Sequence, residues 1–117
     1  MAHYEDIPVD QGADVTIEMH LKNQDGSKKD LTDHFVQSRY ATSYHADSDD
    51  RFYFSSHIAD PATDGIVYLQ LSNAQTSLLN YKKKYVYDVE ISFLPAGGGT
   101  VVERVLEGQL LVSPSVT

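Results

Sequence analysis

Two neighbouring segments carry the residue types that chemistry most often uses. The densest group of oxygen ligands is the stretch 45–50, which reads His-Ala-Asp-Ser-Asp-Asp. A calcium loop of the EF-hand kind needs a glycine and a glutamate at fixed later positions, and the segment 51–54 has neither. We therefore interpret 45–50 as an acidic loop between two strands, and the sequence leaves open whether it binds calcium.

The second segment is Ser55-Ser56-His57, which has two of the residue types of a nucleophilic site. It lies within a predicted strand, where adjacent side chains point to opposite faces, and no glycine-flanked turn exposes a serine. The five histidines form no paired metal motif, and the absence of cysteine removes the usual zinc spacings. We predict no catalytic residue, no metal site and no cofactor, and therefore no enzyme activity and no small-molecule substrate.

The charge balance argues against nucleic acid as a partner. The chain has 17 acidic and 9 basic residues, for a net charge of −8. Binding to DNA or RNA needs clustered Lys and Arg, and the only basic run is Lys82-Lys83-Lys84. No apolar stretch approaches the ~20 residues that cross a bilayer, and the first residues do not resemble a signal peptide. We therefore expect a soluble protein that binds neither nucleic acid nor membrane.

Two long alternations of apolar and polar residues predict the main strands. Residues 13–22 alternate strictly, with Val15, Ile17 and Met19 on the apolar face. Residues 85–93 do the same, and the glycines at 97–99 then predict a hairpin loop. Weaker patterns predict further strands at 4–9, 34–44, 51–58, 66–71 and 101–112.

One segment between the strands has the pattern of a helix. Residues 72–79 begin with good helix-capping residues and continue to two leucines, so we predict one helical turn that crosses from one sheet to the other. Tyr85 or Tyr87 follows this turn, and either is suitable for a tyrosine corner, in which the hydroxyl bonds the backbone upstream.

The last predicted strand, 101–112, is irregular because apolar pairs alternate with polar pairs. A bulge at Gly108 would shift the phase of the alternation and is the interpretation we favour. The other interpretation is that both faces of the strand are partly covered, one of them by another subunit.

Strands spaced every 8–12 residues and separated by turns are typical of a sandwich or barrel. A chain of 117 residues has the size of one domain. We therefore predict an all-β fold over 1–117, as an immunoglobulin-like antiparallel β-sandwich of about seven strands with one short helical turn.

The order of several motifs resembles that of a known group of proteins. The strand opening at 7–14 is followed by Asp25-Gly26, by the segment 29–33 (Lys-Asp-Leu-Thr-Asp) and by the segment 85–89 (Tyr-Val-Tyr-Asp-Val). The chain closes with the segments 102–108 and 114–117. This order resembles small virion structural proteins of T4-like phages of marine cyanobacteria. More distantly, it is similar to the N-terminal domain of the baseplate upper protein of other tailed phages.

The resemblance covers nearly the whole chain and implies a setting. We expect a non-enzymatic structural or adaptor component of a tailed-phage particle, in the tail, baseplate or neck, that is assembled in the host cytoplasm and resides in the virion. Its expected partners are other virion proteins and further copies of itself. The alternative is a carbohydrate- or cell-surface-binding immunoglobulin-like module, which would use the loop tips at 44–50 and 94–100.

The irregular last strand generates the first prediction. We expect Val101, Val105 and Leu111 to contribute to an interface, because they are apolar residues in a strand that has no clean core face. Substitution of Val101 or Val105 by alanine or a charged residue should weaken self-association or partner binding, measured by light scattering. Variants that only unfold the monomer would show instead that these side chains belong to the core.

Overall fold

The two clearest alternations in the sequence form long strands. In the computed structural model, which describes residues 3–43, 45 and 51–115, they are β3 (Val15–His20) and β8 (Tyr85–Phe93). Along β3 the even-numbered residues are exposed and Met19 is buried, as the pattern predicts. Along β8 the odd-numbered residues point inward, and the first four of them are buried. Between these strands, Gly26 has a φ of 88°, as expected for its predicted turn.

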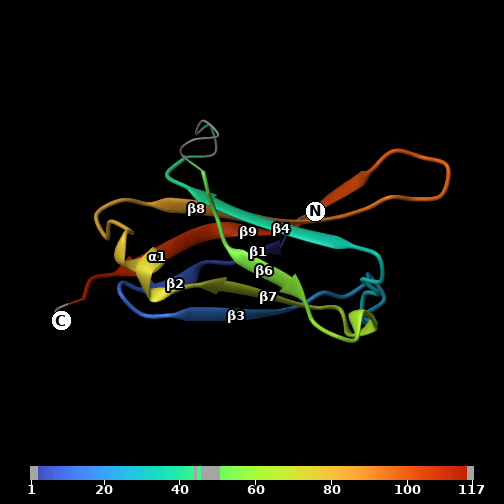
Figure 1. Cartoon of the computed structure of the whole chain (residues 1–117), viewed down its shortest axis with the longest axis horizontal. Coiled ribbons are helices and arrows are strands. Elements are labelled where there is room, and N and C mark those ends of the chain that lie inside the picture. Colours follow the sequence, from blue (N-terminus) through green and yellow to red (C-terminus); the bar gives the residue numbers. More distant parts are fainter. Residues whose placement is uncertain (1–2, 44, 46–50, 116–117) are drawn as a thin grey trace.

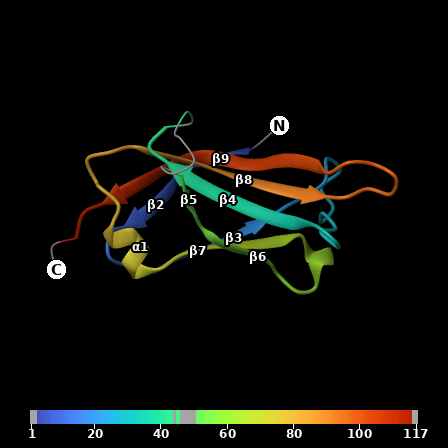
Figure 2. The same cartoon turned by 45° about the horizontal axis from the view of Figure 1, so that its top comes forward.

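The strands form two stacked sheets (Figures 1 and 2). The six-stranded sheet has the order β1-β9-β8-β4-β5, with β2 also paired to β9, and the three-stranded sheet has the order β3-β7-β6. β1 and β2 run parallel to β9, whereas the other pairs are antiparallel. The remaining strands are β1 (His3–Tyr4), β2 (Ile7–Asp10), β4 (Phe35–Ala41), β5 (Phe52–Tyr53), β6 (Ser55–Ile58), β7 (Ile66–Leu71) and β9 (Val101–Ser113).

The core fills the space between the two sheets and is made of the inward-facing apolar side chains. Burial of this apolar surface is the main favourable contribution to folding. Its most buried members come from both sheets and from the loops between them: Val9, Leu31, Val67, Leu69, Leu71, Tyr87, Val89 and Ile91.

The helical turn predicted at 72–79 is α1 (Asn73–Ser77), which connects β7 in one sheet with β8 in the other. Ser72 and Gln75 form a reciprocal capping box at its start. The buried hydroxyl of Thr76 donates a hydrogen bond to the Ala13 carbonyl at 2.8 Å and accepts one from the Gly12 N–H at 3.1 Å. α1 therefore fixes the turn between β2 and β3 and holds this end of the two sheets together.

The two tyrosines that follow α1 have different partners. The backbone N–H of Asn80 donates to the Tyr85 hydroxyl at 2.8 Å, so Tyr85 bonds the backbone five residues upstream. Tyr85 is thus the residue that makes the local contact predicted for a tyrosine corner. The Tyr87 hydroxyl instead donates to the Glu5 carbonyl at 2.5 Å, across 82 positions of the sequence.

The prediction of one strand over 51–58 is wrong. β5 pairs with β4 in the larger sheet, whereas β6 pairs with β7 in the smaller sheet. The chain passes between the sheets at the buried Phe54, whose N–H bonds the Ser38 carbonyl at 3.1 Å. Phe52 stays 51% exposed at the edge of the larger sheet. Period-two alternation continues through such a crossing, so the pattern alone does not reveal that the strand changes sheets.

A bulge interrupts β9, but its predicted position at Gly108 is wrong. Leu106 pairs with Val89 and Arg104 pairs with Glu90, so Val105 is the extra residue. The bulge shifts the alternation and explains why the apolar pairs of this strand fit no single face.

Gly108 has a different role, which is to let the N-terminal segment approach β9. A Cβ atom at this position would collide with the Glu5 carbonyl and would lie 3.2 Å from the Tyr87 ring. The backbone of Glu5 also donates to the Glu107 carbonyl at 2.9 Å. The missing side chain therefore permits the contact that joins β1 and β2 to the larger sheet.

Gly108→Ala should therefore lower the free energy of unfolding by about 1–3 kcal/mol, the usual cost of overpacking a tight site. Urea denaturation would measure the change. Gly99→Ala is the matched control, because an added Cβ there meets nothing within 4 Å. Equal effects of the two substitutions would contradict the role assigned to Gly108.

Candidate protein-contact surface

One row of side chains crosses the outer face of the larger sheet from edge to edge. The register pairs Tyr53 with Arg39, Arg39 with Asp88, Asp88 with Glu107, and Glu107 with Tyr4. Residues that pair across strands point to the same side of a sheet, so these five side chains share the outer face. The row has a tyrosine at each end and charged residues between them, and we call this surface the arginine face.

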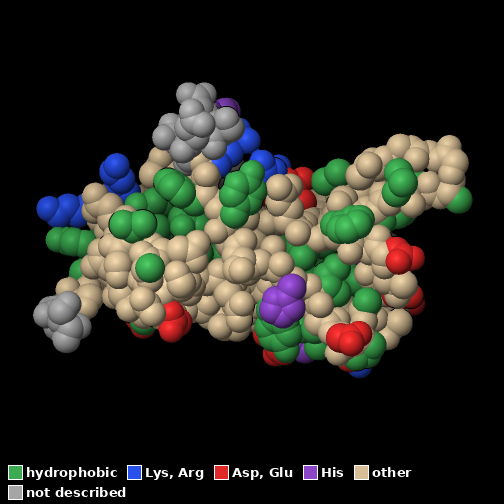
Figure 3. All heavy atoms as spheres, viewed as in Figure 1, with side chains coloured by type: hydrophobic (Ala, Val, Ile, Leu, Met, Phe, Trp, Pro, Cys, Tyr) green, Lys and Arg blue, Asp and Glu red, His purple; other side chains and the backbone are tan. Residues whose placement is uncertain are grey.

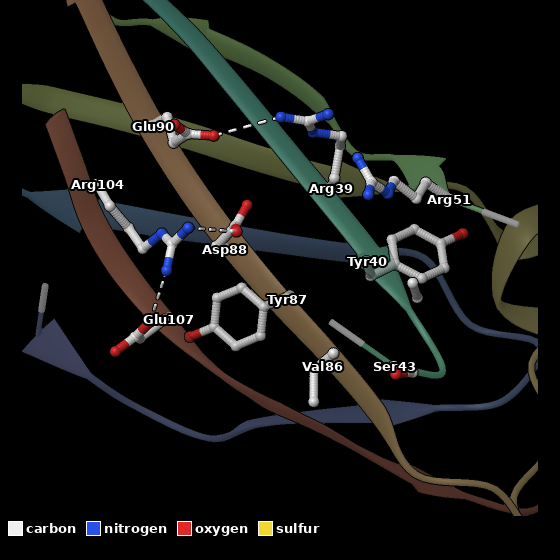
Figure 4. Close-up of a pocket in the computed structure, with 11 residues that line it drawn as sticks. Arg39, Tyr40, Ser43, Arg51, Val86, Tyr87, Asp88, Glu90, Arg104 and Glu107 are labelled. Carbon is white, nitrogen blue, oxygen red and sulfur yellow. Dashed lines mark hydrogen bonds and ion pairs between the residues drawn. The ribbon is translucent and has the colours of Figure 1, made fainter. Parts of the chain in front are cut away.

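The centre of the arginine face is a hollow of about 520 Å³ (Figure 4). Arg39, Arg51 and Arg104 line it, and these are the only arginines of the chain. None of the six lysines, at 22, 28, 29 and 82–84, lines this hollow, so the arginines and the lysines occupy separate parts of the surface. Arginine is the cation that is enriched at protein interfaces, whereas lysine is depleted there.

Ion pairs connect two of the arginines, Arg39 and Arg104, with carboxylates of β8 and β9. Arg39 lies 3.3 Å from Glu90, and Arg104 lies 3.6 Å from Asp88 and 3.4 Å from Glu107 (Figure 4). These pairs hold the guanidinium groups on the surface of the sheet. Because the pairs are partly exposed, each contributes about 1 kcal/mol or less to stability.

The carboxyl group of Asp88, at the centre of this face, has a shifted pKa. Burial raises its pKa above the ordinary value, and the nearby Arg104 offsets part of this effect. The charged form of Asp88 is thus incompletely compensated in the free protein, as expected for a group that lacks part of its solvation.

Large apolar side chains surround the charged centre. Tyr4 and Tyr53 are more than half exposed, and so are Phe35 and Val102. Phe35 of β4 and Val102 of β9 both pair with Ser92 of β8, so they lie in one row across the sheet. Figure 3 shows further hydrophobic side chains in the open, including those on the long β8–β9 hairpin. A face with aromatic edges and arginines at its centre has the composition of a protein contact site.

The structure places the three predicted interface residues on different surfaces. Val101 pairs with Phe93, so its side chain lies on the same side of the sheet as the inward-facing residues of β8. It is nevertheless 42% exposed, because it lies beyond the end of the sandwich. Val105 is the bulge residue and packs against the core. Leu111 pairs with Pro8 on the outer face and is 49% exposed. The three do not form one patch, and their role in an interface stays a prediction.

The described residues of the segments with catalytic residue types do not come together in one site. Along β6 Ser56 is half-buried, whereas Ser55 and His57 are exposed, and the His57 ring stacks on Tyr68 at 5.2 Å. Within residues 3–43, 45 and 51–115, no group of three His, Asp or Glu side chains is placed to hold a metal ion. Most of the acidic loop 45–50, with its open calcium question, lies outside the described residues. No helix in the described part of the chain is long and apolar enough to span a membrane.

Sequence reasoning did not single out the arginine face. Its members come from five separate strands, and each occupies an ordinary outward-facing position in its own strand. The one sequence feature that could have indicated this face is the different placement of lysines and arginines. Every lysine lies in a turn or loop, whereas Arg39 and Arg104 lie within strands.

Comparison with known proteins supports the fold. No family model matches the chain, and no curated protein matches it. Among solved structures, a marsupial T cell receptor superimposes with a TM-score of 0.57 at 12% identity, over 94% of this chain. A second marsupial T cell receptor structure gives 0.53 at 11% identity, over 96% of this chain. The protein is an immunoglobulin-like β-sandwich.

At this level of identity the likeness concerns the fold alone. The immunoglobulin-like domain spans 51% of the first receptor chain and 32% of the second. The predicted fold class is confirmed, including the short helical turn between the sheets.

The raised pKa of Asp88 generates a prediction for pH dependence. Because the folded-state pKa lies above the unfolded one, Asp88 stabilises the fold fully below the unfolded-state pKa, and this contribution is lost as pH rises through the folded-state pKa. Asp88→Asn should therefore raise the free energy of unfolding at about pH 7 by up to ~1 kcal/mol, and the gain should vanish below about pH 4.

Urea denaturation at several pH values would measure this difference. Asp25→Asn is the control, because hydrogen bonds from the Ser27 hydroxyl and backbone N–H lower the pKa of the Asp25 carboxyl. This control should lose stability at neutral pH, the opposite sign. A difference between Asp88→Asn and the wild type that is the same at every pH would contradict the assignment.

Proposed function

We propose that this protein is a non-enzymatic structural or adaptor component of a tailed-phage particle that acts through protein–protein contacts. The contact surface is the arginine face, and its first partner is a second copy of the chain. The observation that carries this proposal is the gathering of all three arginines in one hollow of the larger sheet, in a chain whose net charge is −8.

The order of side chains in the row favours a second copy as the partner. A twofold axis that runs along β8 in the plane of contact would place Tyr53 opposite Tyr4 of the other copy. The same axis would place Arg39 opposite the second Glu107. An interface between identical faces must be self-complementary in this way, and here Arg39 meets Glu107 and the tyrosine at one edge meets the tyrosine at the other.

Asp88 would lie close to the proposed axis, where the two copies bring like charges together. Arg104, 3.6 Å from Asp88 within each copy, would compensate for this repulsion. The arginine face also has as many arginines as carboxylates in its hollow, with Asp88, Glu90 and Glu107 as the acids. Each copy has a net charge of −8, but two copies that meet through this face therefore repel each other less than their net charges alone would predict.

The phage setting is supported by the order of the sequence motifs. Assemblies of this kind join many identical copies by symmetric contacts and need no cofactor, which suits a small domain with a self-complementary face. The setting predicts that the gene lies among genes for tail, baseplate or neck proteins. A gene surrounded by unrelated metabolic genes would contradict it.

Charge exchange across the interface tests the proposed contact. Sedimentation velocity over a range of protein concentrations should show reversible dimers of the wild type. Arg39→Glu alone or Glu107→Arg alone should weaken association by about tenfold or more, because each opposes like charges across the axis. The double variant should regain much of the lost affinity, since the opposite charges then face each other in reversed order.

Lys83→Glu is the matched control, because it makes the same change of charge on an exposed turn outside the arginine face. It should leave the dimer unchanged. A wild type that stays monomeric at every concentration would overturn the proposal, as would equal weakening by Lys83→Glu. Saturable sugar binding that is lost on deletion of 45–50 would support the carbohydrate-binding alternative instead.

A further inference from the structure

The smaller sheet is incomplete along one side. Its order is β3-β7-β6, so β3 pairs with β7 and has no second neighbour among residues 3–43, 45 and 51–115. In the general immunoglobulin scheme the first strand of the chain lies beside the second in this sheet. Here both N-terminal strands, β1 and β2, pair with β9 in the other sheet. In the part of the chain that the structure describes, no strand takes the usual place of the first strand beside β3 (Figure 1).

A groove follows this open edge. Its volume is about 460 Å³, and it lies between β3 on one side and the segment from β1 to β2 on the other. Its apolar lining includes Ile17, Pro8 and Val105, the bulge residue of β9. The groove thus combines two features: a free strand edge, which offers unpaired backbone N–H and carbonyl groups, and a lining of apolar side chains.

The burial of inward-facing residues shows how open this side is. In β7 the inward-facing Val67 and Leu69 are 0% exposed. In the adjacent β3 the inward-facing Val15 and Ile17 are only partly buried, although they also pack against the core. One further strand beside β3 would cover these side chains, as β3 itself covers β7.

The charges around the edge indicate the chemistry of such a strand. Glu18 points outward from the middle of β3, and Glu5 and Asp6 lie on the opposite rim of the groove. Hydrogen bonds from His20 and from the Tyr68 hydroxyl lower the pKa of the Glu18 carboxyl, which therefore stays ionised at neutral pH. A cation directly across from Glu18 on an added strand would be a favourable cross-strand pair.

We infer that the edge of β3 binds an extended segment of a partner protein by strand addition, with apolar residues at alternate positions and Lys or Arg between them. The apolar side chains would enter the groove beside Ile17 and Val105, while the basic ones would face Glu18 on the outside of the sheet. This site is on the other sheet from the arginine face and does not depend on the self-association proposed there.

A synthetic peptide that alternates valine and lysine over the six-residue length of β3 tests the inference. Two peptides serve as comparisons: one alternates valine with glutamate, and one repeats the valine–lysine sequence with N-methylated backbone amides. The valine–lysine peptide should bind to the full chain in a saturable way, about tenfold or more tighter than either comparison. Amide hydrogens of β3 should gain protection from exchange when it binds.

Charge reversal at the centre of the edge provides the matching protein variant. Glu18→Lys should reverse the preference, so that the valine–glutamate peptide binds more tightly than the valine–lysine peptide. Asp10→Lys makes the same change of net charge at an exposed position that does not line the groove, and it should keep the original preference.

Several results would overturn the inference. Equal binding of the N-methylated peptide would show that attraction between charges, not strand addition, holds the peptide. Binding without added protection of β3, or no binding of the valine–lysine peptide to the folded protein, would also do so. A free protein that already dimerises with the β3 amides protected would show that a second copy occupies the edge.

Discussion

The attachment of the N-terminal segment to β9 is the constraint on which the rest of the structure depends. Gly108 has no side chain where the Glu5 backbone passes, and the Tyr87 hydroxyl donates a hydrogen bond to the Glu5 carbonyl. These contacts hold β1 and β2 parallel to β9. A side chain at position 108 would fill the space that the crossing backbone needs, so the route of the first ten residues depends on a single glycine.

This route has consequences on both sheets. In the larger sheet it adds Tyr4 to the end of the row that contains Arg39, Asp88 and Glu107, and thereby completes a face with a tyrosine at each edge. In the smaller sheet it leaves β3 with one neighbour and opens the groove beside Ile17. The attachment of the N-terminal segment to β9 therefore produces both surfaces to which we assign protein contacts. It adds strands to the larger sheet, and it leaves the smaller sheet without a strand beside β3.

The parts of the fold that follow from local patterns were predictable. β3 and β8 have strict alternation, and Ser72 and Gln75 are typical of a helix start, so each element formed where its own residues indicated. The crossing at Phe54 and the bulge at Val105 were not predicted correctly, because both depend on which strand pairs next to which. Alternation records which side of a strand is buried, and it contains no information about the neighbouring strand.

The amino-acid sequence by itself determined that this is an all-β chain of two stacked sheets, with one helical crossover and an acidic surface, because these properties depend on residue type and spacing. Only the tertiary structure decided that Arg39, Arg51 and Arg104 meet in one hollow and that the edge of β3 stays open. The physical reason is that register and strand order bring together residues that are far apart in the chain. Those pairings are set by close packing, such as that at Gly108, which no local pattern encodes.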